Sequence, residues 1–262
     1  MANLARALTV WEKRNYPFRR WRDARPGTVV FPGCSFPSFF PKTLRALRAA
    51  CERAGASMAL DCCGLPLAGL AGQRAFEDVR SRVAERLSRV GATELVAVCP
   101  NCEDALAPTL GLPVGNVYVW LSRAGIGTRA EGEGRVFVPC PDRAKRRWLA
   151  DARAFLPLGA EELPCGCCCG AAFAVERPQE AAAAARRVLA AACDPAFGSA
   201  APRLFVYCAS CAGQLERVRR TLSPDDPAAQ VRIVHVLSAA LGVEERPAVR
   251  TSVANRAGAA LR

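Results

Sequence analysis

Three stretches in the first half of the chain, TVVFPGC (28–34), ASMALDCCG (56–64) and ELVAVCPNC (94–102), carry cysteines at or near their ends. TVVFPGC has the β-branched and apolar residues typical of a short buried strand, and the other two stretches are expected to be the second and third strands. The segments between them, 41–55 and 76–91, have apolar residues at helical spacing and end in glycine. Alternating strands and helices predict a parallel sheet. Because the binding crevice of such a sheet lies at the carboxyl ends of its strands, we expect these cysteines to meet there.

The same arrangement occurs a second time. RVFVPC (135–140), PCGCCCG (164–170) and RLFVYCASC (203–211) repeat the order of cysteines, with helical segments near 143–155 and at 179–193. In both copies 27 residues separate the first cysteine from the CC pair, and a CxxC motif follows. The first set is Cys34, Cys62, Cys63, Cys99 and Cys102; the second set is Cys140, Cys168, Cys169, Cys208 and Cys211. Such self-similarity predicts two copies of one domain.

The expected fold class is therefore α/β, with two tandem, pseudo-symmetric domains and mostly parallel sheets. The expected division is a basic extension at 1–26, a first domain at 27–132, a second domain at 133–243 and a tail at 244–262. VGNVYVWL (114–121) is expected to be a fourth strand of the first domain. VRIVHVL (231–237) is its counterpart in the second domain.

The composition indicates a folded protein of a reducing compartment. Hydrophobic residues make up 51% of the chain and charged residues 23%, which excludes general disorder. The apolar runs are too short for a membrane-spanning helix, and the N-terminal stretch lacks the pattern of a secretory signal. We therefore expect a cytoplasmic location, where thiols serve as metal ligands or redox groups more often than as structural disulfides.

The net charge of +12 is weak support for a nucleic-acid partner, and none is expected. Most basic residues are spread at the spacing of solvated helix faces. Local clusters occur only at 13–25 and 143–147. The first cluster also contains aromatic residues, so it either docks an acidic electron-transfer partner or packs on the first domain.

Five thiolates are one too many for a structural zinc site or for a cubane [4Fe–4S] cluster, each of which takes four. An adjacent pair of cysteines suits a multinuclear cluster, because neighbouring sulfurs reach different iron atoms. Two such sites would allow two one-electron steps on a two-electron substrate such as a disulfide. The alternative is a pair of structural zinc sites, each with one spare thiol.

The pattern PGC…CCG…CPNC, followed by PC…CCCG…CASC, resembles the tandem cysteine-rich CCG domain in the disulfide-cleaving subunit of heterodisulfide reductase. Similar tandem domains occur in iron–sulfur subunits of glycolate oxidase, lactate utilisation and anaerobic glycerol-3-phosphate dehydrogenase systems. The resemblance covers about residues 28–243 and all ten motif cysteines. It implies a noncubane [4Fe–4S] cluster on each five-cysteine set. In some relatives one motif is thought to hold zinc, so zinc in one site stays open.

The resemblance implies an enzyme, an iron–sulfur oxidoreductase that passes electrons from a redox partner to a disulfide or similar two-electron acceptor. The sequence has no ferredoxin-like CxxCxxCxxxCP run, so the expected donor is a separate flavoprotein or ferredoxin-like subunit. Two other classes remain as alternatives. One is a non-catalytic electron-transfer subunit of a flavin dehydrogenase complex, and the other is a zinc-stabilised binding module.

Four cysteines lie outside the repeat. Cys51 and Cys193 fall in or after predicted helices and are expected to be small core residues. Cys165 and Cys167 crowd the second CC pair. They are either alternative ligands or a redox-active pair, and the flexibility of Gly166 allows both.

Three other residues complete the set of candidates. His235, the single histidine, is expected to be structural because it lies among valines at a strand end, although a proton donor would be useful in disulfide reduction. Gly64 and Gly170 each follow a CC pair. They are expected to adopt a positive φ or to let the backbone approach a cluster closely.

Overall fold

Two four-stranded, all-parallel sheets form the framework of the computed structural model, which describes residues 2–193 and 203–261. The first sheet has the order β2–β1–β3–β4, with β1 Gly27–Phe31, β2 Ser57–Met58, β3 Ala92–Ala97 and β4 Val114–Asn116. The second has the order β6–β5–β7–β8, with β5 Arg135–Phe137, β6 Glu161–Glu162, β7 Arg203–Val206 and β8 Arg232–His235. The predicted α/β class and its repeated parallel sheets are confirmed.

The central strands of both sheets are buried and apolar, as expected of parallel sheets that are covered on both faces. In the first sheet Val30 of β1 pairs with Met58 of β2 and Val96 of β3. In the second sheet Val136 of β5 pairs with Phe205 of β7, which in turn pairs with Val234 of β8. The two sheets share one continuous hydrophobic core.

Helices alternate with the strands in both halves. The first half contains α1 Ala2–Asn15, α2 Ser35–Phe39, α3 Pro41–Arg53, α4 Pro66–Leu70, α5 Gln73–Arg89, α6 Pro100–Leu106 and α7 Val117–Arg123. The second contains α8 Arg147–Ala152, α9 Pro178–Ala192, α10 Ala209–Arg219, α11 Val236–Ala240 and α12 Ser252–Leu261. Short 3₁₀ turns are η1 Cys140–Asp142, η2 Ala171–Phe173, η4 Pro227–Gln230 and η5 Val249–Thr251. No helix in the described part of the chain combines the length and apolar character needed to cross a bilayer.

The expectation of a fourth strand over 114–121 is wrong beyond Asn116. The Asn116 side-chain oxygen accepts hydrogen bonds from the backbone N–H groups of Tyr118 (3.0 Å) and Val119 (3.1 Å), and this cap starts α7. His235 does the same at the end of β8, where its ring nitrogen accepts from Leu237 N–H at 3.2 Å. The β-branched and aromatic residues there suggested a strand, but the polar cap turns the chain into a helix. The helix expected near 143–155 is likewise shorter, at Arg147–Ala152.

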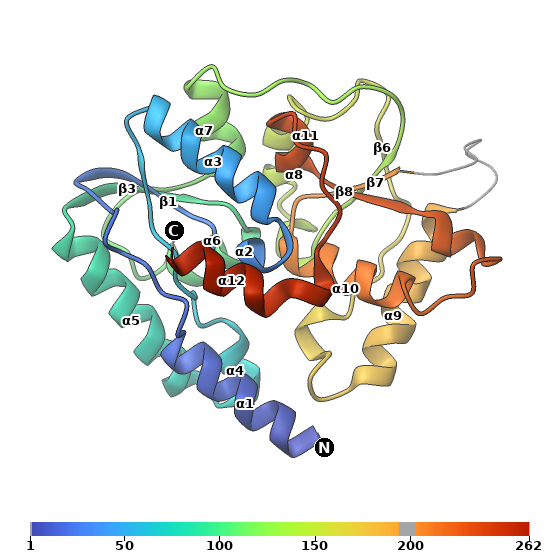
Figure 1. The fold of residues 1–262 in the computed structure, drawn as a ribbon, viewed down its shortest axis with the longest axis horizontal. Helices are drawn as coiled ribbons and strands as arrows, with labels where there is room; N and C mark the ends of the chain where they lie inside the picture. Colours follow the sequence, from blue (N-terminus) through green and yellow to red (C-terminus); the bar gives the residue numbers. More distant parts are fainter. Residues whose placement is uncertain (1, 194–202, 262) are drawn as a thin grey trace.

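The two halves pack through α2 of the first and α10 of the second (Figure 1). Gly213 on α10 permits this close approach, because a Cβ added there would lie 2.2 Å from the Phe39 ring of α2. After the second sheet the chain returns, and α12 runs over α2. On the way, the Glu245 carboxylate accepts from the backbone N–H groups of Lys42 and Thr43, both at 2.8 Å. The C-terminal segment thus holds the start of α3 in the first half.

Gly64 and Gly170 both have positive φ, +79° and +83°, as predicted. We expect Gly170→Ala to lower the free energy of unfolding by about 2 kcal/mol or more, because φ is positive and a Cβ would lie 2.5 Å from the backbone oxygen of Ala181. Denaturant unfolding followed by circular dichroism measures it. Gly159→Ala is the control, since a Cβ there meets nothing within 4 Å. Equal stability of the two variants would contradict this explanation.

Candidate metal centre

The cysteines of each set follow the carboxyl ends of neighbouring strands. In the first half, β1 ends at Phe31 shortly before Cys34, and β3 ends at Ala97 shortly before Cys99. Cys99 stands immediately before α6, so the CxxC motif forms the turn into that helix. Cys208 stands in the same relation to β7 and α10. The sheet topology thus brings the cysteines of each half to one edge, as the sequence predicted.

The five thiols of the first set form a continuous series of side-chain contacts. Cys34 contacts Cys62, and Cys62 contacts its neighbour Cys63. Cys63 contacts Cys102, which contacts Cys99. All five side chains are buried.

The second set repeats this series in the same order. Cys140 contacts Cys168 with a sulfur–sulfur distance of 3.6 Å, and Cys168 contacts Cys169. Cys169 contacts Cys211 at 3.2 Å, and Cys211 contacts Cys208. Unlike the first set, this one reaches the surface, since Cys140 is exposed and Cys168 is partly exposed.

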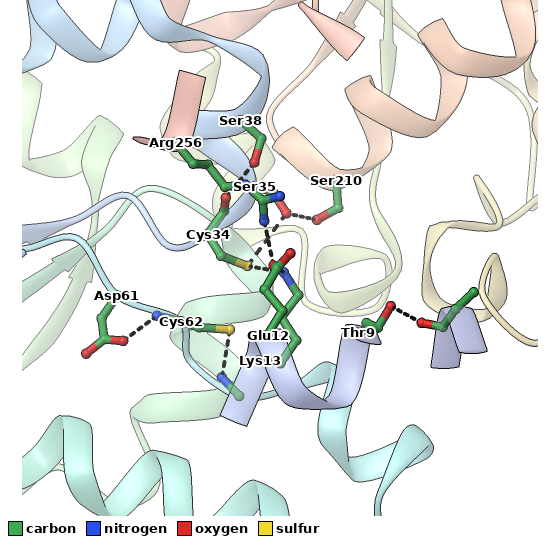
Figure 2. A network of polar contacts seen from close by, with 12 residues as sticks. Thr9, Glu12, Lys13, Cys34, Ser35, Ser38, Asp61, Cys62, Ser210 and Arg256 are labelled. Carbon is green, nitrogen blue, oxygen red and sulfur yellow. Dashed lines mark hydrogen bonds and ion pairs between the residues drawn. The ribbon is translucent and has the colours of Figure 1, made fainter. Parts of the chain in front are cut away.

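The two sets meet at Cys99 and Cys208, which occupy equivalent positions in the repeat and contact each other. Asn101 of the first half donates to the Cys208 sulfur at 3.5 Å. The hydroxyls of Ser35 and Ser210 share a hydrogen bond of 2.9 Å across the same junction (Figure 2). The ten repeat cysteines therefore make one thiol series, which runs from buried Cys34 to exposed Cys140.

The structure describes all fourteen cysteines, and all are free thiols. No three of the described His, Cys, Asp and Glu side chains are arranged to hold a metal ion between them. The thiols of each set instead contact one another in pairs. As donors they are soft sulfur ligands, the class that zinc and iron–sulfur clusters take. The chemistry of the donor set therefore fits a thiolate-bound metal group.

The second cysteine of each CC pair is the most acidic thiol of its pair. Hydrogen bonds from Cys102 and Cys62 lower the pKa of Cys63 to about 5. Hydrogen bonds from Cys168 and Cys211 lower the pKa of Cys169 to about 4. Both positions therefore favour the thiolate, which is the form that binds metals.

The N-terminal helix places the positive charge of Lys13, whose side chain is 14% exposed, beside the first set, as Figure 2 shows. Lys13 Nζ lies 3.5 Å from the Cys34 sulfur and 2.8 Å from a Glu12 carboxylate oxygen. Burial alone would lower the pKa of Lys13, but Cys34, Cys62 and Glu12 raise it above its ordinary value, so the ammonium is retained. The basic segment at 13–25 is thus partly a covering of the first set. The sequence pointed to this segment but not to Lys13.

Tyr16 completes this covering. Its ring is buried in contact with Cys34 and Cys62, and its φ of +33° is unusual for a residue with a side chain. Its hydroxyl is buried and has no hydrogen-bond partner among the described residues. The sequence pointed to the aromatic residues of the 13–25 segment and to their packing on the first domain as one alternative, but not to this contact with the thiols.

Asp61 anchors the first CC pair. One carboxylate oxygen accepts from the backbone N–H of Cys62 at 2.8 Å. The other accepts from the Trp21 indole at 2.9 Å and from Arg19 and Arg86 at 3.1 Å each. The Asp61 side chain is only 2% exposed. Arg19 and Trp21 of the 13–25 segment therefore help to hold the first CC pair in place through Asp61.

In the second half, Asp142 and Arg143 organise the segment after Cys140. The Asp142 carboxylate accepts from Trp148 N–H (3.0 Å) and from the Tyr207 hydroxyl (2.8 Å). The Arg143 guanidinium lies 3.7 Å from the Cys140 sulfur and donates to the Cys167 carbonyl oxygen at 2.7 Å. It thereby ties Cys140 to the loop that precedes the second CC pair.

The cysteines outside the repeat and His235 differ in their surroundings. Cys51 is buried in the core on α3, as predicted, whereas Cys193 is only partly buried and donates to the Pro227 carbonyl oxygen at 3.3 Å. Cys165 and Cys167 contact each other beside the second set. Burial lowers the pKa of His235 to about 3, so the ring is neutral near pH 7 and is no imidazolium proton donor.

The role of His235 as a helix cap gives a testable prediction. Asn116 caps α7 at the corresponding place, so asparagine can supply the same acceptor at position 235. We expect His235→Asn to be more stable than His235→Ala by about 1 kcal/mol, because both lose the ring and only alanine loses the cap. Denaturant unfolding of the pair measures the difference. Equal stability would show that the cap contributes nothing.

One comparison with known proteins matches a cysteine-rich family over part of the chain. Residues 28–107 match the family model of the cysteine-rich domain CCG. The motif of the first half indicated this match, and a CCG domain suggests metal or iron–sulfur binding. No curated protein matches the chain.

Two solved structures share a loose likeness of fold. Picrophilus torridus aspartate racemase is 6% identical, with a TM-score of 0.37, over 88% of this chain and 99% of that chain. Allantoin racemase from Klebsiella pneumoniae is 14% identical, with a TM-score of 0.32, over 88% of this chain and 93% of that one. Likeness at these scores has no bearing on the function.

Proposed function

We propose that this chain is an iron–sulfur oxidoreductase in which each five-cysteine set binds one [4Fe–4S] cluster, of the noncubane kind found in heterodisulfide reductase. The observation that carries the proposal is the unbroken thiol series, in which two equivalent sets meet at Cys99 and Cys208. Structural zinc sites have no need of such a junction, whereas electron exchange between two centres requires them to be close.

When bound, such clusters supply one-electron storage. The residues of this chain determine what surrounds them. Burial of the first five thiols excludes water, and the Lys13 ammonium offsets negative charge at Cys34. At the other end Cys140 is exposed, so among the described residues the second set is the one that an electron acceptor can approach closely. We therefore propose that electrons leave from the second half.

The acceptor we propose is a disulfide or a similar two-electron compound, because two one-electron centres supply the two electrons that a disulfide needs. The electron donor is a separate redox protein, a flavoprotein or a ferredoxin-like subunit. Fourteen free thiols fit a reducing compartment, so we propose that the protein works in the cytoplasm.

The test uses the full chain, purified without oxygen, with reduced methyl viologen as donor and oxidised glutathione as acceptor. We expect viologen oxidation with the release of two thiols per disulfide, and loss of this activity after iron is removed with a chelator. Bound iron and sulfide without turnover would instead indicate a plain electron-transfer subunit. Zinc without sulfide would contradict the proposal.

A further inference from the structure

The loop before the second CC pair carries two cysteines that the first half lacks. Cys165 and Cys167 stand where the first half has Ala59 and Asp61. The five-thiol set of the first half is therefore complete without them, and the second set has the same five. The two extra thiols are not needed to hold a second group of the same kind.

The geometry of this loop brings its two thiols together. The Cys165 and Cys167 side chains contact each other, and the backbone N–H of Cys167 donates to the Cys165 sulfur at 3.3 Å. Gly166 between them has no Cβ, and an added one would meet nothing within 4 Å. A bond between the two sulfurs would close a small ring that contains Gly166.

The loop is held by its backbone, which leaves both thiols free to react. Arg143 donates to the carbonyl oxygens of Gly166 (3.0 Å) and Cys167 (2.7 Å). In the first half Asp61 occupies the position equivalent to Cys167, and its buried side chain anchors the CC pair. Cys165 and Cys167 are instead partly exposed, at the end of the series where Cys140 also reaches the surface.

We propose that Cys165 and Cys167 form a reversible dithiol–disulfide pair that exchanges with a small-molecule disulfide at the open end of the thiol series. One thiol attacks the external disulfide, which forms a mixed disulfide and releases the first external thiol. The other protein thiol attacks that mixed disulfide, which closes the Cys165–Cys167 bond and releases the second. The external disulfide gains two electrons and two protons, and the protein dithiol loses them.

This inference rests on the proposed function for its reductant. Iron–sulfur groups held by the repeat cysteines would supply the two electrons that, with two protons from solvent, break the Cys165–Cys167 bond and restore both thiols. Arg143 links the loop to Cys140 at 3.7 Å from its sulfur, so the pair lies next to the second set. The pair would thus be the place where the acceptor is reduced.

In the test, the full chain is purified without oxygen and equilibrated in glutathione buffers of increasing oxidised fraction. Free thiols are then blocked with an alkylating agent, and peptide mapping shows which cysteines were alkylated. We expect Cys165 and Cys167 to become protected from alkylation together, because they form one intramolecular disulfide. The change from mostly reduced to mostly oxidised should span about a hundredfold change in the ratio of oxidised glutathione to the square of reduced glutathione, as for any two-electron couple.

Cys165→Ser and Cys167→Ser should each leave the remaining thiol as a stable mixed disulfide with glutathione. Cys193→Ser is the matched control, a lone and partly exposed cysteine whose removal leaves the pair unchanged. The proposal is overturned if the wild-type pair forms mixed disulfides with glutathione without forming the internal bond. It is equally overturned if the pair stays reduced in a buffer in which Cys193 forms a mixed disulfide with glutathione. The proposal is also overturned if the variant with both Cys165→Ser and Cys167→Ser loses metal, because the two cysteines would then be metal ligands.

Iron and sulfide are measured on the same samples. If both are bound and the pair stays reduced, this inference fails while the proposed function stands. If neither iron nor sulfide is bound, the proposed function fails, and the peptide map still shows whether the pair exchanges with glutathione.

Discussion

Replacing Cys102 with serine is expected to remove about half of the iron and sulfide from the anaerobically purified chain. Cys102 is buried and contacts both Cys63 and Cys99, so its loss interrupts the first set between these two thiols. The second set does not depend on it and should keep its metal. Cys211→Ser is the equivalent change in the second half, and the double variant should bind almost none.

Cys51→Ser is the control for this series, because Cys51 on α3 is equally buried and no repeat cysteine is among the groups that act on its thiol. It should retain the full metal content, even if the polar hydroxyl costs some stability. Metal analysis with a protein assay measures all four variants. Unchanged metal in Cys102→Ser, or an equal loss in Cys51→Ser, would contradict the assignment of the first set.

The second large effect is expected at Asp61. Replacing it with alanine leaves Arg19 and Arg86 without their carboxylate and the Cys62 N–H without its acceptor. Breaking a buried ion pair by removing one partner costs about 3–5 kcal/mol. We expect the lower end, about 3 kcal/mol, because the two arginine side chains are 30% and 22% exposed and water partly solvates them.

Asp78→Ala is the matched control for Asp61→Ala. Asp78 pairs with Arg14 at 3.7 Å, but both side chains are about half exposed, so the loss should be within about 0.5 kcal/mol. Denaturant unfolding followed by far-ultraviolet circular dichroism compares them, since Trp21 fluorescence would itself respond to Asp61. Equal destabilisation by the two changes would show that the buried anchor contributes no more than a surface pair.

The repeat in the sequence was enough to predict both parallel sheets and the edge at which each set of cysteines lies. This worked because the spacing of apolar residues and the order of the cysteines are local properties that recur in both copies. The prediction for 114–121 was wrong because apolar periodicity does not register a cap such as Asn116. The boundary between strand and helix there depends on one side-chain oxygen.

The contact between Cys99 and Cys208 lay beyond sequence reasoning, which treated the two sets as separate sites. It depends on how the halves pack, and that packing rests on the approach of Phe39 to Gly213. Lys13 was hidden for the same reason, since α1 reaches the first set only in the folded chain. Asp61 had a weak signal, because it directly precedes the first CC pair.

The central claim is that the thiol series holds iron–sulfur groups in both halves. The most direct test is the content of iron, zinc and acid-labile sulfide per chain after expression and purification without oxygen. We predict iron and sulfide in comparable amounts, with a low zinc content. Zinc at both sites, with no sulfide, would contradict the claim.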